Sequence, residues 1–366
     1  MTDASDNKSA THSRATSSTP IRVLIAEDSI TIRHYLTDLL EEIPGFEVIG
    51  QAVDGEHAVQ LAGELRPDVI SMDIRMPVMD GMEATRHIMA ANPLPVVIVS
   101  GLVERDIDLS FQAIEAGALA VVEKPPSRDH PQFHQKHRQL VRTLAAMARV
   151  SVVRRVTKPL TTPSRPPRTR RLYNQPELIA IGASAGGPRA LSRLLGGLPT
   201  DLAVPIVVAQ HIPHEFIPGL ARWLDQATPL TVKVAEDGVV LRPGVVNLSP
   251  GTAHLQVKRE SGLLVMRLQS EIGPYRYQPS VDVLFESVAM ACGTQAVGLL
   301  LTGMGDDGAN GLLAIRERGG RTFAQDKTSA TVFGMPGAAI ERGAAEKVVS
   351  LAELPSAILK LVPGTG

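Results

Sequence analysis

The chain has little of several features that would narrow its function. It carries one cysteine, Cys292, so it forms no intramolecular disulfide, and the apolar stretch around this residue predicts a core position. A formal net charge of −1 gives no concentrated positive field for nucleic acid or an anionic membrane. The sequence contains no run of about 18 apolar residues, which a transmembrane helix would need. These absences predict a cytoplasmic protein that neither binds nucleic acid nor inserts into a membrane.

Two segments have the composition of unfolded chain. Residues 1–20 are polar and rich in serine and threonine, and they contain no apolar core of a secretory signal, which predicts a disordered tail. Residues 148–176 form a basic, proline-rich stretch that favours an extended linker. A nucleic-acid-binding arm is the alternative interpretation of this stretch, but aromatic side chains for base stacking are not interleaved with its basic residues.

The remaining residues predict two α/β domains. Residues 21–147 alternate short apolar runs such as IRVLIA with longer amphipathic stretches, the pattern of a doubly wound parallel sheet with crossover helices. Residues 177–366 begin a second alternation with ELIAIGAS and continue through PIVVAQH and AVGLLLTG. These long apolar runs favour strands buried on both faces, with some antiparallel additions. The sequence therefore predicts a flavodoxin-like first domain and a Rossmann-like second domain.

Polar residues follow the predicted strands of the first domain where those strands end. They are Glu27, Asp28, Asp73, Ser100 and Lys124. The carboxyl ends of parallel strands meet at one edge of the sheet, where ligands bind. Carboxylates crowded there repel one another unless a cation lies between them, and their oxygens suit Mg²⁺. One acidic residue after a strand is usually only solvated, but this joint occurrence with a lysine predicts a cation site.

The first domain resembles the receiver domain of bacterial response regulators. The resemblance is carried by ED at 27–28, MDIRMPVMDG at 72–81, VSG at 99–101 and EKP at 123–125. It implies that Asp73 is the phosphorylated residue and that Glu27 and Asp28 bind Mg²⁺ together with it. It also implies that Ser100 and Lys124 contact the phosphoryl group and take part in the conformational switch of the domain on phosphorylation.

The second domain places a hydroxyl, an imidazole and carboxylates after three predicted strands. Ser184 follows LIAIGA, His211 ends PIVVAQH, and Asp306 and Asp307 follow LLLTGMG. Together they fit acyl transfer, in which the imidazole takes the serine proton and a carboxylate orients it. Spacing does not choose between the two aspartates, and the glycine-rich turn after Ser184 also suits a phosphate-binding loop. His254, after the turn SPGT, is a further candidate for the cleft.

Residues 177–362 resemble the catalytic domain of the chemotaxis protein-glutamate methylesterases. The matching stretches are IGASAGG, AQHIP, LSPGTAHL, QPSVDVLFES, LLTGMGDDGANG and AQDKTSATVFGMPGAA. The resemblance implies a triad of Ser184, His211 and Asp307, with no cofactor. It also implies an oxyanion donor at the backbone N–H of Met304.

Among the positions that depart from the patterns of these families, two bear on the predicted sites. Val121 stands three residues before the receiver lysine, where many receivers have an aromatic residue. Ala185 follows the predicted nucleophile, where relatives often have threonine. A side-chain hydroxyl is therefore missing beside the serine, and an oxyanion hole there must use backbone N–H groups.

The two resemblances together imply a phosphorylation-regulated hydrolase that acts on glutamate methyl esters of methyl-accepting chemotaxis proteins. They also imply deamidation of specific glutamines by the same route, and a chemotaxis histidine kinase as phosphodonor. One alternative is an adaptor that docks a receptor or kinase without turnover, but it has no reason to keep the serine, histidine and aspartate. Another is a DNA-binding regulator, but no helix-turn-helix pattern follows residue 150.

Overall fold

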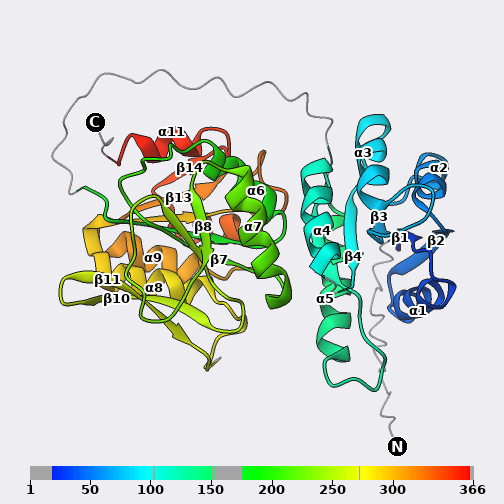
Figure 1. Ribbon diagram of the computed structural model, residues 1–366, viewed down its shortest axis with the longest axis horizontal. Helices are drawn as coiled ribbons and strands as arrows, with labels where there is room; N and C mark the ends of the chain where they lie inside the picture. Colours follow the sequence, from blue (N-terminus) through cyan, green and yellow to red (C-terminus); the bar gives the residue numbers. More distant parts are fainter. Residues whose placement is uncertain (1–18, 102–103, 151, 153–174, 272, 363–366) are drawn as a thin grey trace, which may run out of the picture.

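The chain forms two α/β units, which lie side by side in Figure 1. The computed structural model describes residues 19–101, 104–150, 152, 175–271 and 273–362. Most of the predicted tail (1–20) and linker (148–176) lies outside these residues. Among the described helices, none combines the length and the apolar character needed to cross a membrane.

The first unit is a five-stranded parallel sheet with the strand order β2-β1-β3-β4-β5. Its elements are β1 (Ile21–Ala26), α1 (Ile30–Glu41), β2 (Phe46–Ala52), α2 (Gly55–Leu65), β3 (Val69–Met72), α3 (Gly81–Ala91), β4 (Val96–Ser100), α4 (Glu104–Ala116), β5 (Ala120–Glu123) and α5 (Phe133–Met147). This order is that of the flavodoxin-like fold, which confirms the prediction. Strands β3 and β4 are buried at every position, because helices cover both faces of the sheet.

Apolar residues of the helices sort onto the two faces of this sheet. Those of α1 and α5 pack on one face, and those of α2, α3 and α4 pack on the other. The side chains of Ser29, Asp54 and Asp80 accept backbone N–H groups at the starts of α1, α2 and α3. These caps satisfy donors that a helix leaves unpaired, and they fix the turns that carry the charged residues at the carboxyl edge.

The second unit is a seven-stranded parallel sheet with the order β14-β13-β12-β6-β7-β9-β8. Its main elements are β6 (Leu178–Ala183), α6 (Gly187–Gly196), β7 (Ile206–Gln210), η1 (His214–Phe216), α7 (Ile217–Ala227), β8 (Thr231–Val234), β9 (Val245–Leu248), α8 (Val281–Cys292), η2 (Gly293–Gln295), β12 (Ala296–Leu300), α9 (Ala309–Glu317), β13 (Arg321–Gln325), α10 (Met335–Glu341), β14 (Lys347–Val349) and α11 (Leu354–Leu359). The expected antiparallel addition is a hairpin of β10 (His254–Glu260) and β11 (Leu263–Gln269), which forms a sheet of its own.

Helices cover both faces of the second sheet as well. Residues of α6, α7 and α11 pack on one face, and residues of α8, α9, α10 and the hairpin pack on the other. Cys292 is buried at the end of α8, where burial raises the pKa of its thiol to about 12. The prediction that this cysteine is a core residue is therefore confirmed.

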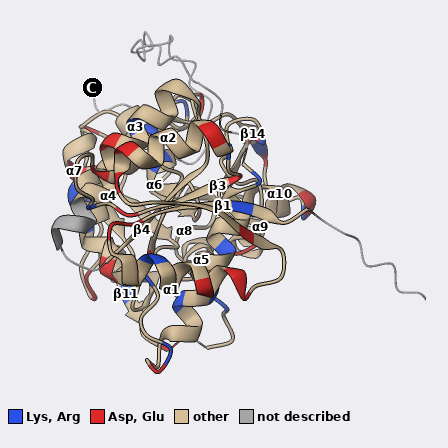
Figure 2. Cartoon of the chain, turned by 90° about the vertical axis from the view of Figure 1, so that its right-hand side faces the viewer, with Lys and Arg blue, Asp and Glu red and all other residues tan. Residues whose placement is uncertain are grey.

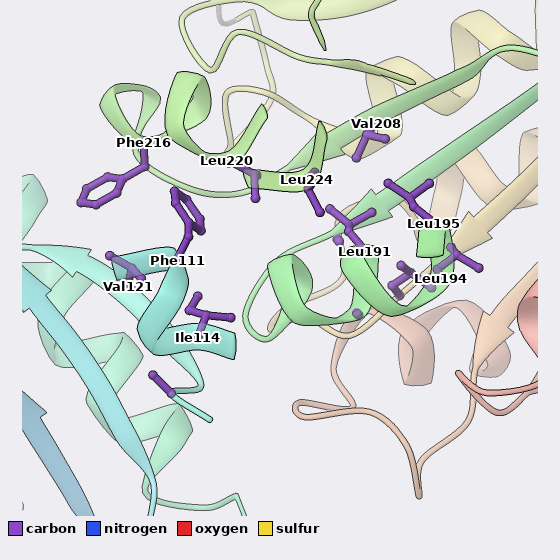
Figure 3. Packing of buried hydrophobic residues seen from close by; sticks show 14 of the residues in the cluster. Phe111, Ile114, Val121, Leu191, Leu194, Leu195, Val208, Phe216, Leu220 and Leu224 are labelled. Atoms are coloured by element: carbon purple, nitrogen blue, oxygen red, sulfur yellow. The ribbon is translucent and has the colours of Figure 1, made fainter. Parts of the chain in front are cut away.

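The two units pack against each other through α4 of the first and α6 and α7 of the second. Phe111 on α4 stacks on Trp223 of α7, with ring centroids 5.6 Å apart and planes 18° from parallel. Figure 3 shows Phe111 and Ile114 facing the helices that carry Leu191 and Leu220. Figure 2 shows acidic and basic residues interspersed over the outer helices and loops.

Candidate active site and receiver site

Three neighbouring strands of the second sheet carry the predicted triad at one edge. Ser184 directly follows β6, His211 directly follows β7, and Asp307 lies in the loop between β12 and α9. Strand β6 lies between β7 and β12, and the chain winds outward from it in both directions. Open α/β sheets bind ligands at such a switch point, beyond the carboxyl ends of the strands.

Asp307 is held by four hydrogen bonds in a buried position. Its carboxylate accepts from His211 Nε2 at 2.8 Å, Ser280 Oγ at 2.9 Å, Val281 N at 2.8 Å and Asp282 N at 3.0 Å. The last three donors stand at the start of α8, where backbone N–H groups favour an anion. Burial raises the pKa of Asp307, but its bond to His211 and those backbone donors outweigh this and the net shift is downward.

The neighbouring Asp306 has a different environment. Its side chain is 59% exposed, and its carboxylate accepts from Arg342 at 2.6 Å. The Asp306 carboxylate thus faces Arg342, whereas Asp307 binds the imidazole of His211 directly. Tertiary structure therefore distinguishes two aspartates that spacing left equivalent.

The orientation of His211 decides which of its nitrogens is available to the serine. Because Nε2 contacts Asp307, Nδ1 is the ring nitrogen left to take a proton. Among the described residues, no hydrogen bond joins the Ser184 hydroxyl to His211. Catalytic hydrogen bonds are often long without substrate and tighten in the complex, so this geometry still fits a nucleophile and its base.

The turn after β6 brings Ser184 close to the loop that follows β12. A Cβ on Gly303 would lie 2.8 Å from the Ser184 Cβ, so only glycine permits this approach. Gly186 has a φ of 76°, which also favours glycine. The next residue of the loop after Gly303 is Met304. Within the described part of the chain its backbone N–H donates to no protein acceptor, which fits the predicted oxyanion donor.

Several residues of this site were not among the predictions. Gln210 Nε2 donates to the carbonyls of Ser184 and His211, at 2.8 and 3.0 Å. Thr302 Oγ1 donates to the carbonyl of Ala185 at 2.8 Å. Tyr277 stacks on the His211 ring. Gln210 could have been found as a polar residue ending an apolar strand, but no sequence signal assigned Tyr277 or Ser280.

His254, the further cleft candidate, lies inside the protein. It is 0% exposed, and its Nδ1 accepts from the backbone N–H of Ser280 at 3.0 Å. Because Ser280 also donates to Asp307, His254 supports the position of that carboxylate from inside the protein.

The predicted receiver residues lie together at the carboxyl edge of the first sheet. Oxygen atoms of Glu27, Asp28 and Asp73 lie within 4.8 Å of one another, an arrangement that could hold a metal ion. The Lys124 ammonium lies 2.7 Å from Glu27 Oε2 and 2.9 Å from Asp73 Oδ2. Ser100 ends β4 and is fully buried.

Burial and like charge act together on these acids. Burial is the largest cause that raises the pKa of Glu27 and of Asp73, and Lys124 only partly opposes it. Burial alone would lower the pKa of Lys124, but the two carboxylates outweigh it and the pKa is raised. Because the anionic forms of two carboxylates are destabilised, a divalent cation would be favoured at this site. The donor set, all carboxylate oxygens, fits Mg²⁺.

The contact between the two units reaches the turn that carries Ser184. Ala185 and Val332 pack against the apolar cluster of the receiver that includes Leu119 and Val122. Lys136 on α5 binds Glu123 and also lies 3.5 Å from Glu215, four residues after His211. The first unit therefore touches both the turn that carries Ser184 and the loop that follows His211. Val121 is buried in β5 within the cluster that includes Phe111.

Comparison with known proteins matches two separate parts of the chain. The model of the response regulator receiver domain matches residues 23–138, and that of the CheB methylesterase matches residues 179–358. The solved structure of the Thermotoga maritima CheB methylesterase catalytic domain is 37% identical with a TM-score of 0.50, and the match covers 52% of this chain and 100% of that one.

Two curated relatives match along nearly their whole length. Protein-glutamate methylesterase/protein-glutamine glutaminase 4 of Myxococcus xanthus is 46% identical over 351 residues, which cover 95% of this chain and 98% of the relative. The corresponding protein 3 of Anaeromyxobacter dehalogenans is 44% identical over 330 residues, which cover 90% and 96%. With its receiver domain and serine–histidine–aspartate site, the chain belongs to the family of protein-glutamate methylesterases/protein-glutamine glutaminases.

Proposed function

We propose that Ser184, His211 and Asp307 hydrolyse the methyl esters of glutamate side chains in methyl-accepting chemotaxis proteins. The observation that carries this proposal is the buried Asp307 carboxylate, 2.8 Å from His211 Nε2, beside the strand that ends at Ser184. The site offers a nucleophile, a base and an orienting carboxylate on rigid strand ends, which are the parts that acyl transfer needs.

The reaction follows from the roles of these atoms. Ser184 Oγ attacks the ester carbonyl while its proton passes to His211 Nδ1, and Asp307 stabilises the imidazolium through Nε2. The carbonyl oxygen becomes an anion, which the backbone N–H of Met304 stabilises. Methanol leaves with the proton from His211. Water then attacks the acyl-enzyme and gives a proton to His211, which passes it to Ser184 Oγ as the acyl–oxygen bond breaks and glutamate is released.

Deamidation of glutamine uses the same sequence of steps. The side-chain amide takes the place of the ester, ammonia leaves in place of methanol, and water releases glutamate from the same acyl-enzyme. No further residue is required, because His211 already delivers the proton that the leaving amine needs.

The two adjacent aspartates provide a test of the triad. Asp307→Asn is expected to lower methanol release on the order of 10⁴-fold, because an amide cannot stabilise the imidazolium and favours the wrong tautomer. Asp306→Asn is the matched control, and we expect activity within about threefold of wild type since exposed ion pairs contribute little. If Asp306→Asn has the larger effect, Asp307 is not the triad carboxylate.

We propose that Asp73 in the receiver domain is the phosphorylated residue. Its carboxylate would attack the phosphorus of the donor, the bond from phosphorus to the donor's leaving group would break, and Lys124 would pair with the phosphoryl oxygens. Glu27, Asp28 and Asp73 would hold Mg²⁺, which supplies charge neutralisation for the incoming phosphoryl group. Ser100, at the end of the adjacent strand, would contact the phosphoryl group once it is attached.

Labelling by a small phosphodonor tests this assignment. Asp73→Asn is expected to abolish Mg²⁺-dependent phosphorylation, because an amide is no nucleophile, and Asp28→Asn is expected to weaken it by removing one metal ligand. The measurement is the mass added to the intact protein by the acyl phosphate, recorded at neutral pH with and without a chelator. Undiminished phosphorylation of Asp73→Asn would place the acceptor elsewhere.

We propose that the unphosphorylated receiver domain, residues 21–147, covers the site of the catalytic domain, residues 177–366. Support comes from its contacts with Ala185 beside the nucleophile and with Glu215 beyond the histidine. Residues 148–176 would serve as the linker that permits the two domains to separate. Residues 1–20 would remain a tail outside both.

The setting that fits this chemistry is the cytoplasm, with receptor segments as substrates and a chemotaxis histidine kinase as phosphodonor. The test of the whole proposal is methanol release from membranes that contain methylated receptors, with and without a phosphodonor. We expect release in both conditions and a large increase with the donor. The adaptor alternative requires that no methanol is released in either condition.

A further inference from the structure

The aromatic ring of Tyr277 covers one face of the imidazole of His211. The ring centroids are 4.7 Å apart and the planes are 21° from parallel, so the two rings stack. Tyr277 lies between β11 and α8, three residues before the Ser280 that binds Asp307. The guanidinium of Arg276 lies 5.6 Å from the centroid of the same tyrosine ring. The tyrosine therefore contacts the histidine from a segment that already supports the triad.

Stacking supplies a restraint that the hydrogen bond to Asp307 cannot give. That bond fixes one ring atom, Nε2, and leaves the imidazole able to tilt about it. A flat ring in contact with the face of the imidazole limits this tilt. Since the proton from Ser184 must arrive at Nδ1, the plane of His211 determines whether that nitrogen faces the hydroxyl.

The stack also contacts the imidazolium that forms during the reaction. His211 becomes an imidazolium when it takes the serine proton, and the face of an aromatic ring attracts a cation. The attraction is stronger after proton transfer than before it. It therefore lowers the barrier without tightening the binding of the ester, which is an effect on kcat.

The tyrosine hydroxyl reaches the loop that carries the proposed oxyanion donor. A Cβ on Gly305 would lie 3.4 Å from the Tyr277 hydroxyl oxygen, and Gly305 follows Met304 directly. Tyr277 thus spans the distance between the base and the oxyanion loop.

We propose that Tyr277 is a positioning residue for His211, which it holds by its aromatic face; this proposal rests on the hydrolase function proposed above. Its hydroxyl is not required for that role. The chemistry it assists is proton transfer from Ser184 to His211 Nδ1, with the same bonds made and broken as in the mechanism above.

Two substitutions separate the aromatic face from the hydroxyl. Tyr277→Phe keeps the face, and we expect its kcat for methanol release to remain within about threefold of wild type. Tyr277→Leu keeps an apolar side chain without the face, and we expect kcat to fall about tenfold with KM changed less than twofold, the size of one moderate cation–aromatic contact. Both are measured in the full-length protein with a phosphodonor present.

A small sulfonyl fluoride provides the second readout, because it reacts with an activated serine without receptor docking. Ser184 Oγ bonds to sulfur, fluoride leaves, and the hydroxyl proton passes to His211. We expect the labelling rate to fall about tenfold in Tyr277→Leu and to stay near wild type in Tyr277→Phe. Tyr277→Gln is the substitute for the leucine variant if thermal unfolding shows that the latter does not fold, and the same fall is expected.

The outcomes distinguish this inference from the proposed function. If wild-type Ser184 is not labelled and releases no methanol, the hydrolase proposal fails. If wild type is active and the leucine or glutamine variant, correctly folded, is labelled as fast as wild type, the positioning role of Tyr277 is wrong. A fall in Tyr277→Phe as large as that in Tyr277→Leu would also overturn it, because the hydroxyl would then be the active part.

Discussion

Replacing Ser184 by alanine is expected to abolish methanol release and leave the protein folded. The hydroxyl forms the covalent intermediate, so its loss removes the acyl-enzyme route completely. Rate loss on the order of 10⁴-fold or more is expected, since the members of a triad act as a unit. The measurement is methanol release from methylated receptor membranes, with wild type and Ser184→Ala at equal concentration and with phosphodonor present.

The structure predicts that this substitution is structurally mild. Ser184 uses its backbone N–H to bind Thr302 and its carbonyl to accept from Gly187 and Gln210, and alanine keeps all three of these bonds. The thermal unfolding midpoint should therefore stay close to wild type. Activity within about tenfold of wild type would remove Ser184 from the nucleophile role. His211→Ala should lose nearly as much activity, because a serine without its base is a weak nucleophile.

Removing the receiver domain is expected to make the hydrolase active without any phosphodonor. A chain that begins at Gln175 retains the whole second sheet and loses the receiver surfaces that contact Ala185 and Glu215. Suppose that the receiver, by covering the site, lowers activity about a hundredfold. The covered arrangement is then favoured over the open one by only ~2.7 kcal/mol, which an interdomain contact of ordinary size can supply. Methanol release by this chain should match that of the phosphorylated full-length protein.

Two full-length variants test the same coupling without removing a domain. Asp73→Asn should keep the low basal rate in the presence of phosphodonor, since the receiver cannot be modified. Trp223→Ala removes the stacking partner of Phe111 from the catalytic side and should raise the basal rate several-fold, because the closed arrangement loses an aromatic contact of about 0.5–1.5 kcal/mol. Trp223 is the only tryptophan, so its fluorescence also reports whether the contact opens.

Failure of the shortened chain to exceed the unphosphorylated protein would contradict simple occlusion. The receiver would then have to activate the hydrolase by positive contact, or deliver it to the receptor. Equal basal rates in Trp223→Ala and wild type, together with an active shortened chain, would place the restraining contact elsewhere, for example at the Lys136–Glu215 pair.

The sequence by itself determined the two α/β domains and the edges of their sheets that carry the chemistry. Continuous apolar runs, without alternation of apolar and polar residues, predict central parallel strands. The residues that follow such strands must gather at one edge of the sheet. Ser184, His211 and the pair of aspartates were identifiable for this reason, and so were Glu27, Asp28, Asp73 and Lys124. The family resemblance rested on short motifs, each of which can be found within a few neighbouring residues of the sequence.

The tertiary structure decided which groups meet, and for the two aspartates it agrees with the family resemblance where spacing made no choice. Asp307 contacts His211 and Asp306 turns to Arg342, a distinction that depends on the start of α8, some 25 residues earlier in the chain. Tyr277 stacks on His211, which lies 66 residues earlier in the sequence. Contacts of this kind arise from packing between distant segments, and neither hydrophobic periodicity nor local spacing encodes them, because both describe neighbours along the chain.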